Sequence, residues 1–209
     1  METYQGVKFA YRQVSQSCPD HPFLNRLNYW VFLFSQLGLA PVHSTGAYGN
    51  QSFRTVNDSF IITKSSMVPE KELNRENYTL VEGYTPDTGI FLTKGASPPS
   101  SECFLHHYIY QEDTSIQAIF HGHCDLLSQH AQELGIAVTD KFYDYGTKEL
   151  AESARLTMSE GNKFFILKDH GFVALGPNLD DAGKLTLTHY MKLISTLSQT
   201  LPPEQSESE

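Results

Sequence analysis

The 209-residue sequence contains few basic residues, few cysteines and no long apolar run. Lys and Arg total 15 against 24 Asp and Glu, so the formal net charge is -9. Because an acidic protein repels phosphate backbones, this balance argues against nucleic-acid binding and against docking on anionic membranes. A small anionic ligand is not excluded, since a few oriented backbone N–H groups can hold one phosphate locally.

Cysteine is limited to three residues, Cys18, Cys103 and Cys124. An odd number, in a chain long enough to bury a sizeable core, argues against a secreted disulfide scaffold. No window approaches the roughly 18 apolar residues of a membrane span, and residues 1–5 lack the character of a signal peptide. We therefore expect a cytoplasmic protein without a membrane span.

Hydrophobic spacing predicts a mixture of helices and strands. Apolar residues at steps of three and four predict helices, whereas alternating or short continuous apolar runs predict strands. The expected helices cover 24–39, 98–111, 125–134, 147–159 and 180–197, and the expected strands cover 52–56, 60–63, 79–84, 89–93, 116–123, 163–168 and 172–175. Strands and helices do not alternate regularly along the chain. This order therefore predicts an α/β fold with a largely antiparallel sheet flanked by helices.

The chain shows no internal repeat and no dividing linker. We expect one domain over residues 24–200, preceded by an N-terminal extension, 1–23, to which no role is assigned. After Leu201, the residues up to 209 are only Pro, Glu, Gln and Ser, and this composition predicts an acidic flexible tail over 201–209.

The strongest chemical signal is a pair of histidines, His121 and His123, at the end of an expected strand. Successive side chains on a strand alternate faces, so both imidazoles point to one side about 7 Å apart, a spacing that suits zinc. Ile116, Ala118 and Phe120 are then expected on the opposite, core-facing side. The glycine between the histidines leaves room there. The alternative interpretation is a pair of half-buried surface histidines.

Two further candidates lie where an element begins or ends. His170 follows an apolar strand and precedes a glycine, where a side chain can be aimed into a cleft; alternatively it is an ordinary turn histidine. Glu102 follows Ser100 and Ser101 at the start of an expected helix. This group is either an ordinary helix start or an anion site in which Glu102 is a base or a metal ligand.

Two loops carry small polar residues that could cradle a phosphate. One includes Asn50 after a glycine, and the other includes Ser65 and Ser66 after the strand at 60–63. Exposed N–H groups in such loops bind anions, although most Gly-Asn pairs are simply turns.

Taken together and in this order, five segments resemble the class II (zinc-dependent) aldolase/adducin family. They are GNQSFR (49–54), PSSE (99–102), HGH (121–123), YGTKELA (145–151) and DHG (169–171). The resemblance spans residues from about 25 to 195. It implies a three-layer α/β/α fold with a central, mainly antiparallel sheet. It also implies a homotetramer with its sites at subunit interfaces.

The resemblance also assigns roles to the candidates. His121, His123 and His170 would bind zinc, and Glu102 would ligate the metal at rest and act as the base. Manganese, iron or cobalt would suit the same ligands. The implied phosphate contacts are Asn50, Ser65, Ser66, Ser100 and Ser101. Ser65 and Ser66 stand where these aldolases usually carry Thr-Gly, so the hydroxyl is kept and the glycine is lost.

Two assignments stay open within this family. His106 lies one helical turn after Glu102 on the same side and is the second choice as a ligand. The family's aldolases offer a tyrosine acid to the neighbouring subunit, but neither Tyr143 nor Tyr145 aligns with it securely. The proton donor is therefore not assigned.

The resemblance implies a metal-dependent lyase that cleaves a phosphorylated ketose. Retro-aldol cleavage through a zinc-stabilised enediolate would give dihydroxyacetone phosphate and an aldehyde. The alternatives are an epimerase, dehydratase or decarboxylase on the same scaffold, or a non-catalytic adducin-like interaction module. The adducins lack the metal histidines, so their presence here favours an enzyme.

Overall fold

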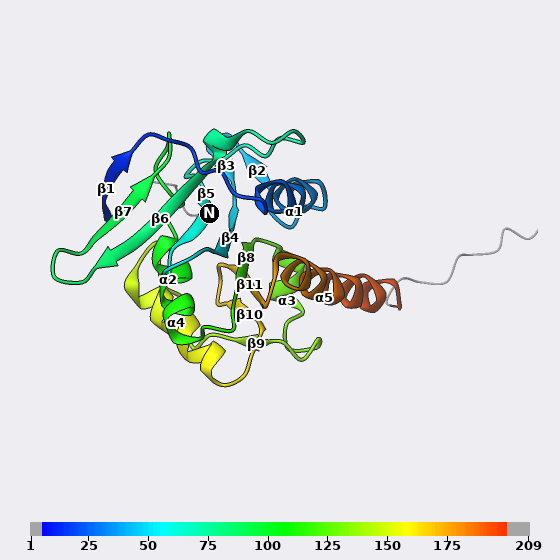
Figure 1. The fold of residues 1–209 in the computed structure, drawn as a ribbon. Helices are drawn as coiled ribbons and strands as arrows, with labels where there is room; N and C mark the ends of the chain where they lie inside the picture. The colour runs from blue at the N-terminus through cyan, green and yellow to red at the C-terminus, as the bar shows by residue number, and fades with distance from the viewer. Residues whose placement is uncertain (1–5, 200–209) are drawn as a thin grey trace, which may run out of the picture.

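A nine-stranded sheet forms the middle layer of this computed structural model, which describes residues 6–199 (Figure 1). The expected tail at 201–209 lies outside the described residues. In spatial order the strands are β1 (Ala10–Ser15), β7 (Ile90–Lys94), β6 (Tyr78–Thr85), β5 (Phe60–Thr63), β4 (Gly49–Arg54), β8 (Ala118–Gly122), β11 (Gly171–Gly176), β10 (Phe164–Leu167) and β9 (Ala137–Val138). Only the outermost pairs, β1–β7 and β10–β9, are parallel, so the prediction of a mainly antiparallel sheet is confirmed.

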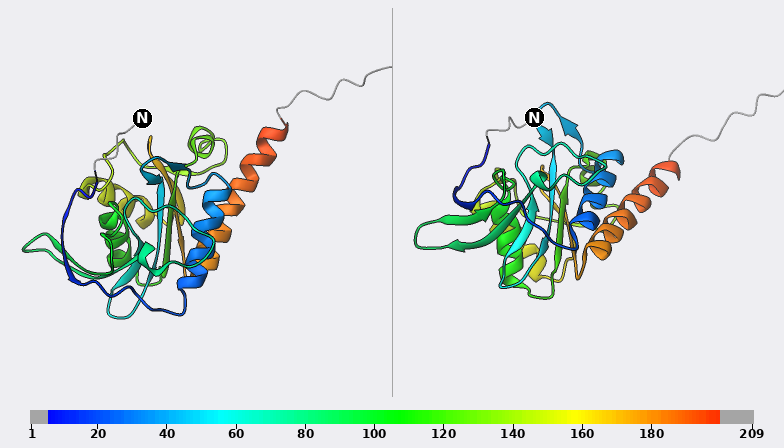
Figure 2. Two further views of the ribbon diagram at one scale, coloured as in Figure 1. Left: turned by 90° about the horizontal axis from the view of Figure 1, so that it is seen from above. Right: turned by 45° about the horizontal axis from the view of Figure 1, so that its top comes forward.

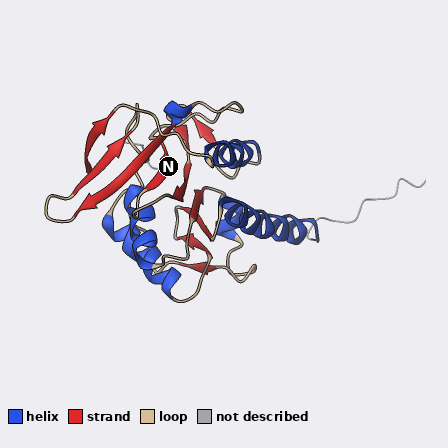
Figure 3. Ribbon diagram, in the orientation of Figure 1, coloured by secondary structure: helices blue, strands red, loops and turns tan. Residues whose placement is uncertain are grey.

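Helices cover both faces of this sheet (Figure 3). One layer contains α1 (Leu24–Gln36), α3 (Asp125–Gln129) and α5 (Leu179–Gln199), and the other contains α2 (Cys103–Glu112) and α4 (Lys148–Ser159). Figure 2 shows α1 and α5 side by side, with the end of α5 reaching beyond the rest of the fold. The three-layer α/β/α fold is thereby confirmed. The smaller elements are β2 (Val42–His43), β3 (Gly46–Ala47) and the 3₁₀ turn Arg75–Asn77.

The core is divided in two by the sheet, as the alternation of strand side chains requires. On β8, Phe120 packs towards α1, with its ring centroid 5.4 Å from that of Phe34. Ile119 faces the α2 and α4 layer instead. Ala118 shares the face of Phe120, as expected, but Ile116 packs in the opposite cluster because the strand begins only at residue 118.

Other local expectations also differ from the structure, and helix α2 begins at Cys103 rather than at residue 98. Strand β1 lies inside the expected N-terminal extension and pairs with β7, and Phe9 before it packs on Phe91 at 5.0 Å. Helix α3 ends at Gln129, several residues before Gly135. The short strand β9 was not expected. The domain boundaries at 24 and 200 stay predictions. No helix among residues 6–199 combines the length and hydropathy needed to cross a bilayer.

Gly122 ends β8 at a crowded point. A Cβ at this position would lie 2.2 Å from the Leu39 carbonyl oxygen and 2.6 Å from the ring of Phe172. No larger residue fits there without moving backbone. The room expected opposite the histidine pair is therefore the space that Phe172 and Leu39 fill.

Substituting Gly122 with Ala should destabilise the protein. Overpacking a filled core costs about 1–3 kcal/mol, so the midpoint of thermal unfolding should fall. The matched control is Gly83→Ala, because a Cβ at Gly83 has no neighbour within 4 Å. Equal melting temperatures for the two variants, measured by circular dichroism, would contradict the packing argument.

Candidate metal centre

Three histidines from two neighbouring strands converge on one point. His121 is the penultimate residue of β8, His123 follows the strand directly, and His170 occupies the turn between β10 and β11. Ligand atoms of the three rings all lie within 4.8 Å of one another. The Nε2 atoms of His121 and His123 are 3.1 Å apart. The shared face predicted for this pair is therefore confirmed.

The turn that carries His170 is a tight one. Its backbone N–H donates to the Leu167 carbonyl at 3.0 Å. Asp169 adopts a φ of +56°, a left-handed conformation that Asp tolerates better than most residues. This turn directs the imidazole towards β8. The structure thus uses His170 as a pocket residue, and the alternative of an ordinary turn histidine does not apply.

Glu102 lies against this cluster at the start of α2. Its Oε2 is 3.0 Å from His121 Nε2, and its Oε1 is 2.9 Å from His170 Nε2. Asn50 Nδ2, from β4, donates to Oε2 at 2.6 Å. Glu102 is the N-cap residue of α2, yet its side chain makes no capping hydrogen bond. The carboxylate therefore faces the histidines rather than capping the helix, and its role as a metal ligand or base stays a prediction.

The electrostatics of the cluster favour an ionised acid among imidazoles. Burial alone would raise the pKa of Glu102, but the charges and hydrogen bonds of His121 and His170 outweigh it, and the pKa lies well below its usual value. Burial, reinforced by the other two histidines, lowers the pKa of His123 well below its usual value. Glu102 is thus ready to compensate a positive charge, and His123 is neutral and able to donate a lone pair.

The donor set fits a divalent metal ion. His121 Nδ1 lies 2.8 Å from the Phe172 carbonyl oxygen, which can only accept, so Nδ1 carries a proton. Nε2 faces His123 and donates to the ionised Glu102 carboxylate; a bound ion would take the place of that proton. Such a backbone contact, which fixes the tautomer, is typical of metal-binding histidines. Three imidazoles and a carboxylate suit zinc and also manganese, iron or cobalt.

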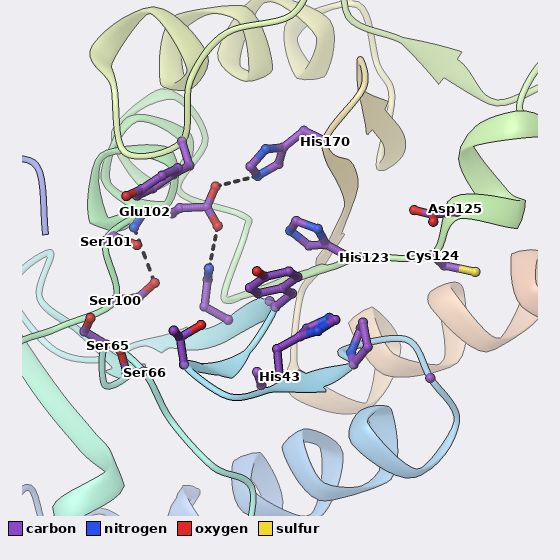
Figure 4. A pocket seen from close by; sticks show the side chains of 18 of the residues that line it. His43, Ser65, Ser66, Ser100, Ser101, Glu102, His123, Cys124, Asp125 and His170 are labelled. Atoms are coloured by element: carbon purple, nitrogen blue, oxygen red, sulfur yellow. Dashed lines mark hydrogen bonds and ion pairs between the residues drawn. The ribbon is translucent and has the colours of Figure 1, made fainter. Parts of the chain in front are cut away.

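A cavity of about 770 Å³ opens from the cluster. Ser100 and Ser101 line one end of it together with Ser65 and Ser66, which lie on the Glu102 side in Figure 4. Two backbone hydrogen bonds join the segments, from Ser65 N to the Pro98 oxygen and from Ser100 N to the Thr63 oxygen, both at 3.0 Å. The four predicted serines therefore share one end of the pocket.

Ser66 stands where the resemblance implies a glycine. Its φ is +55°, in the left-handed region that glycine occupies without strain. Asn50 is directed to Glu102 rather than to the serines, and its role as a phosphate contact stays a prediction.

The second-choice ligand and the two candidate tyrosines lie in three different places. His106 lies outside the histidine cluster, because its Nε2 contacts Asn50 Oδ1. Tyr145 lines the cavity, whereas Tyr143 lines a different surface depression beside α4.

The opposite end of the cavity contains residues that the sequence did not single out. His43, Cys124 and Asp125 lie there in Figure 4. The Tyr48 ring is 4.1 Å from that of His43 and 5.6 Å from that of His123, centroid to centroid. No sequence motif identified His43 and Tyr48. The fold of the β2–β3 hairpin brings them to the cavity.

The family model described as the class II aldolase and adducin N-terminal domain matches residues 35–191. The chain belongs to this family. An L-fuculose phosphate aldolase from Methanococcus maripaludis strain C5 is 30% identical over an alignment of 153 positions that covers 66% of this chain and 77% of that protein. With these relatives and this histidine cluster, the chain is an enzyme, a class II aldolase or a related one.

Solved structures of class II aldolases share the fold. An L-fuculose 1-phosphate aldolase aligns with a TM-score of 0.65 at 22% identity, over 90% of this chain and 94% of that one. A sugar-phosphate aldolase from Thermotoga maritima aligns with a TM-score of 0.68 at 18% identity, over 86% and 97% of the two chains. At these identities the similarity establishes the architecture.

The purified protein should carry about one divalent ion per chain, and His121→Ala should lose it because two lone-pair donors remain of the three. His130→Ala is the control, since His130 directly follows α3 and pairs with Glu133, outside the histidine cluster. Inductively coupled plasma mass spectrometry counts and identifies the ion. Equal metal content in the two variants, with zinc supplied, would show that the ion binds elsewhere.

Proposed function

We propose that this class II aldolase family member is a metal-dependent lyase that cleaves a phosphorylated ketose by a retro-aldol reaction. The observation that carries the proposal is the position of Glu102. Its carboxylate bridges His121 and His170 at the metal centre. The serine-lined end of the cavity begins one residue away. A base, a metal site and an anion site are therefore contiguous. The names of the relatives, an L-fuculose phosphate aldolase and a sugar-phosphate aldolase, support the substrate class.

His121, His123 and His170 would hold the ion together with Glu102. When bound, a divalent ion supplies Lewis-acid stabilisation of the negative charge that develops on the substrate oxygens. We propose zinc as this ion, because imidazole nitrogen and carboxylate oxygen are among its preferred ligands.

Glu102 handles the proton that a retro-aldol reaction transfers. The carbon–carbon bond breaks, the hydroxyl of the aldehyde fragment gives up its proton, and the carbon of the ketone fragment gains one. The low pKa of Glu102 keeps it ionised at rest. Once substrate oxygens replace its contacts with the histidines, the carboxylate can carry the proton at that carbon. Because Glu102 starts ionised, the proton that it delivers to this carbon in cleavage is the one released by the hydroxyl of the aldehyde fragment, passed to Glu102 directly or through another group. In the reverse condensation the same proton travels the opposite way.

The four serines would bind the phosphate. Ser100 and Ser101 precede the first turn of α2, where the helix dipole favours an anion. Ser65 and Ser66 contribute hydroxyl groups from the facing loop. By family resemblance we further propose a homotetramer with sites at subunit interfaces and a cytoplasmic location.

Replacing Glu102 with Gln should remove most turnover and spare the fold. A correctly placed general acid–base group contributes roughly 10²–10⁴-fold, so kcat should fall by at least about two powers of ten with zinc supplied in excess. The control is Glu149→Gln, an exposed acid at the start of α4. Near-normal rates in Glu102→Gln would remove Glu102 from the mechanism.

The double variant Ser100→Ala, Ser101→Ala should raise KM for phosphorylated substrates far more than it lowers kcat. The lost hydroxyl groups bind a part of the substrate that does not react, so ground state and transition state weaken together. A panel of phosphorylated ketoses beside their unphosphorylated forms provides the measurement. An unchanged KM would contradict the phosphate assignment, and epimerised or dehydrated products would replace the lyase proposal with one of its alternatives.

A further inference from the structure

A line of buried polar side chains runs through the core to the back of Glu102. The Tyr110 hydroxyl is 2.8 Å from Ser52 Oγ, which is 2.7 Å from His106 Nδ1. On the other side of the ring, His106 Nε2 contacts Asn50 Oδ1, and Asn50 Nδ2 donates to Glu102 Oε2 at 2.6 Å. The His106 side chain is completely buried, as is that of Ser52. The line comes from α2 and β4, two elements that are far apart in the sequence.

The carboxylate at one end fixes the direction of every hydrogen bond in this line. Ionised Glu102 only accepts, so the Asn50 amide must turn its NH₂ group to it and its oxygen to His106. His106 Nε2 must then donate, which leaves Nδ1 as an acceptor for the Ser52 hydroxyl. Ser52 in turn accepts from Tyr110. One tautomer of His106 therefore satisfies the whole line.

The environment of His106 keeps the ring in this neutral state. Burial lowers its pKa to about 3, with a smaller lowering from His121 and an opposing contribution from Glu102. Phe60 of β5 packs beside the ring, with the two rings nearly parallel and their centroids 6.4 Å apart. Both ring nitrogens have partners, so His106 is not oriented to bind the ion itself.

We propose that His106 is a positioning residue that fixes the orientation of the Asn50 amide and, through it, holds the Glu102 carboxylate at the metal centre. Without the donor at Nε2, the amide can rotate by half a turn and place its oxygen against a carboxylate oxygen. Two acceptors then face each other, and Glu102 is no longer held. The inference rests on the proposed function only in taking Glu102 as the acid that faces the metal.

The experiment compares three substitutions on α2. His106→Leu removes both nitrogens, whereas His106→Gln keeps an N–H donor at nearly the reach of Nε2. His107→Leu is the control, because His107 is the neighbouring, half-buried histidine and its ring packs on Phe91 rather than on the site. For each variant, competition with a chelating dye measures Zn²⁺ affinity, and circular dichroism measures the fraction folded. With a ketose phosphate that the wild type cleaves, kcat and KM are measured per folded molecule.

His106→Leu should weaken Zn²⁺ binding and lower kcat by about 10–100-fold, the usual effect of removing a partner of a metal ligand. KM should change far less. His106→Gln should recover most of both losses, and His107→Leu should match the wild type. Two results would overturn the proposal: wild-type Zn²⁺ affinity in His106→Leu, or equal losses in the Gln and Leu variants.

Two further controls keep the outcomes separate. If His106→Leu does not fold, Ser52→Ala decides, because it releases Nδ1 and the tautomer with a small change in volume; weaker Zn²⁺ binding supports the proposal and unchanged binding overturns it. If the wild type cleaves no ketose phosphate, the proposed function fails. The Zn²⁺ affinities of the His106 variants then still decide whether the line positions Glu102.

Discussion

A buried carboxylate must be matched by hydrogen-bond donors or by positive charge, and this requirement determines which side chains can surround Glu102. In the metal-free chain, His121, His170 and Asn50 meet the requirement together. Two of these three are also the expected metal ligands, so an ion would act on atoms already arranged around the acid. The cluster and the polar line behind it therefore form one electrostatic unit with Glu102 at its centre.

The sheet order explains how one acid collects partners from distant parts of the sequence. Strands β4, β8 and β11 are neighbours in space, and they bring Asn50, His121 and the turn of His170 to one end of the sheet. Helix α2 begins beside them and contributes Glu102. The adducin-like interpretation, a module without metal chemistry, does not account for this convergence of ligands.

Local patterns predicted most of the fold and the main ligands. The apolar run 60–63 gave a strand with matching bounds, and strand alternation placed His121 and His123 on one face. Strand β1 was missed because its side chains are nearly all exposed and show no alternation. Helical spacing likewise put His106 near Glu102, but whether it would face the ion or Asn50 depends on β4, which spacing along one helix does not describe.

The distance between the ligands in the sequence also has a consequence for folding. Asn50 and Glu102 are 52 positions apart, and Glu102 and His170 are 68 apart. Chains synthesised from the N-terminus expose the two histidines of β8 well before the turn of His170 exists. The complete ligand set can form only after β11 has paired with β8, a long-range step of the kind that slows folding. Loading of the proposed ion would therefore come late in folding, and a chain that lacks β11 cannot hold the turn of His170 against β8.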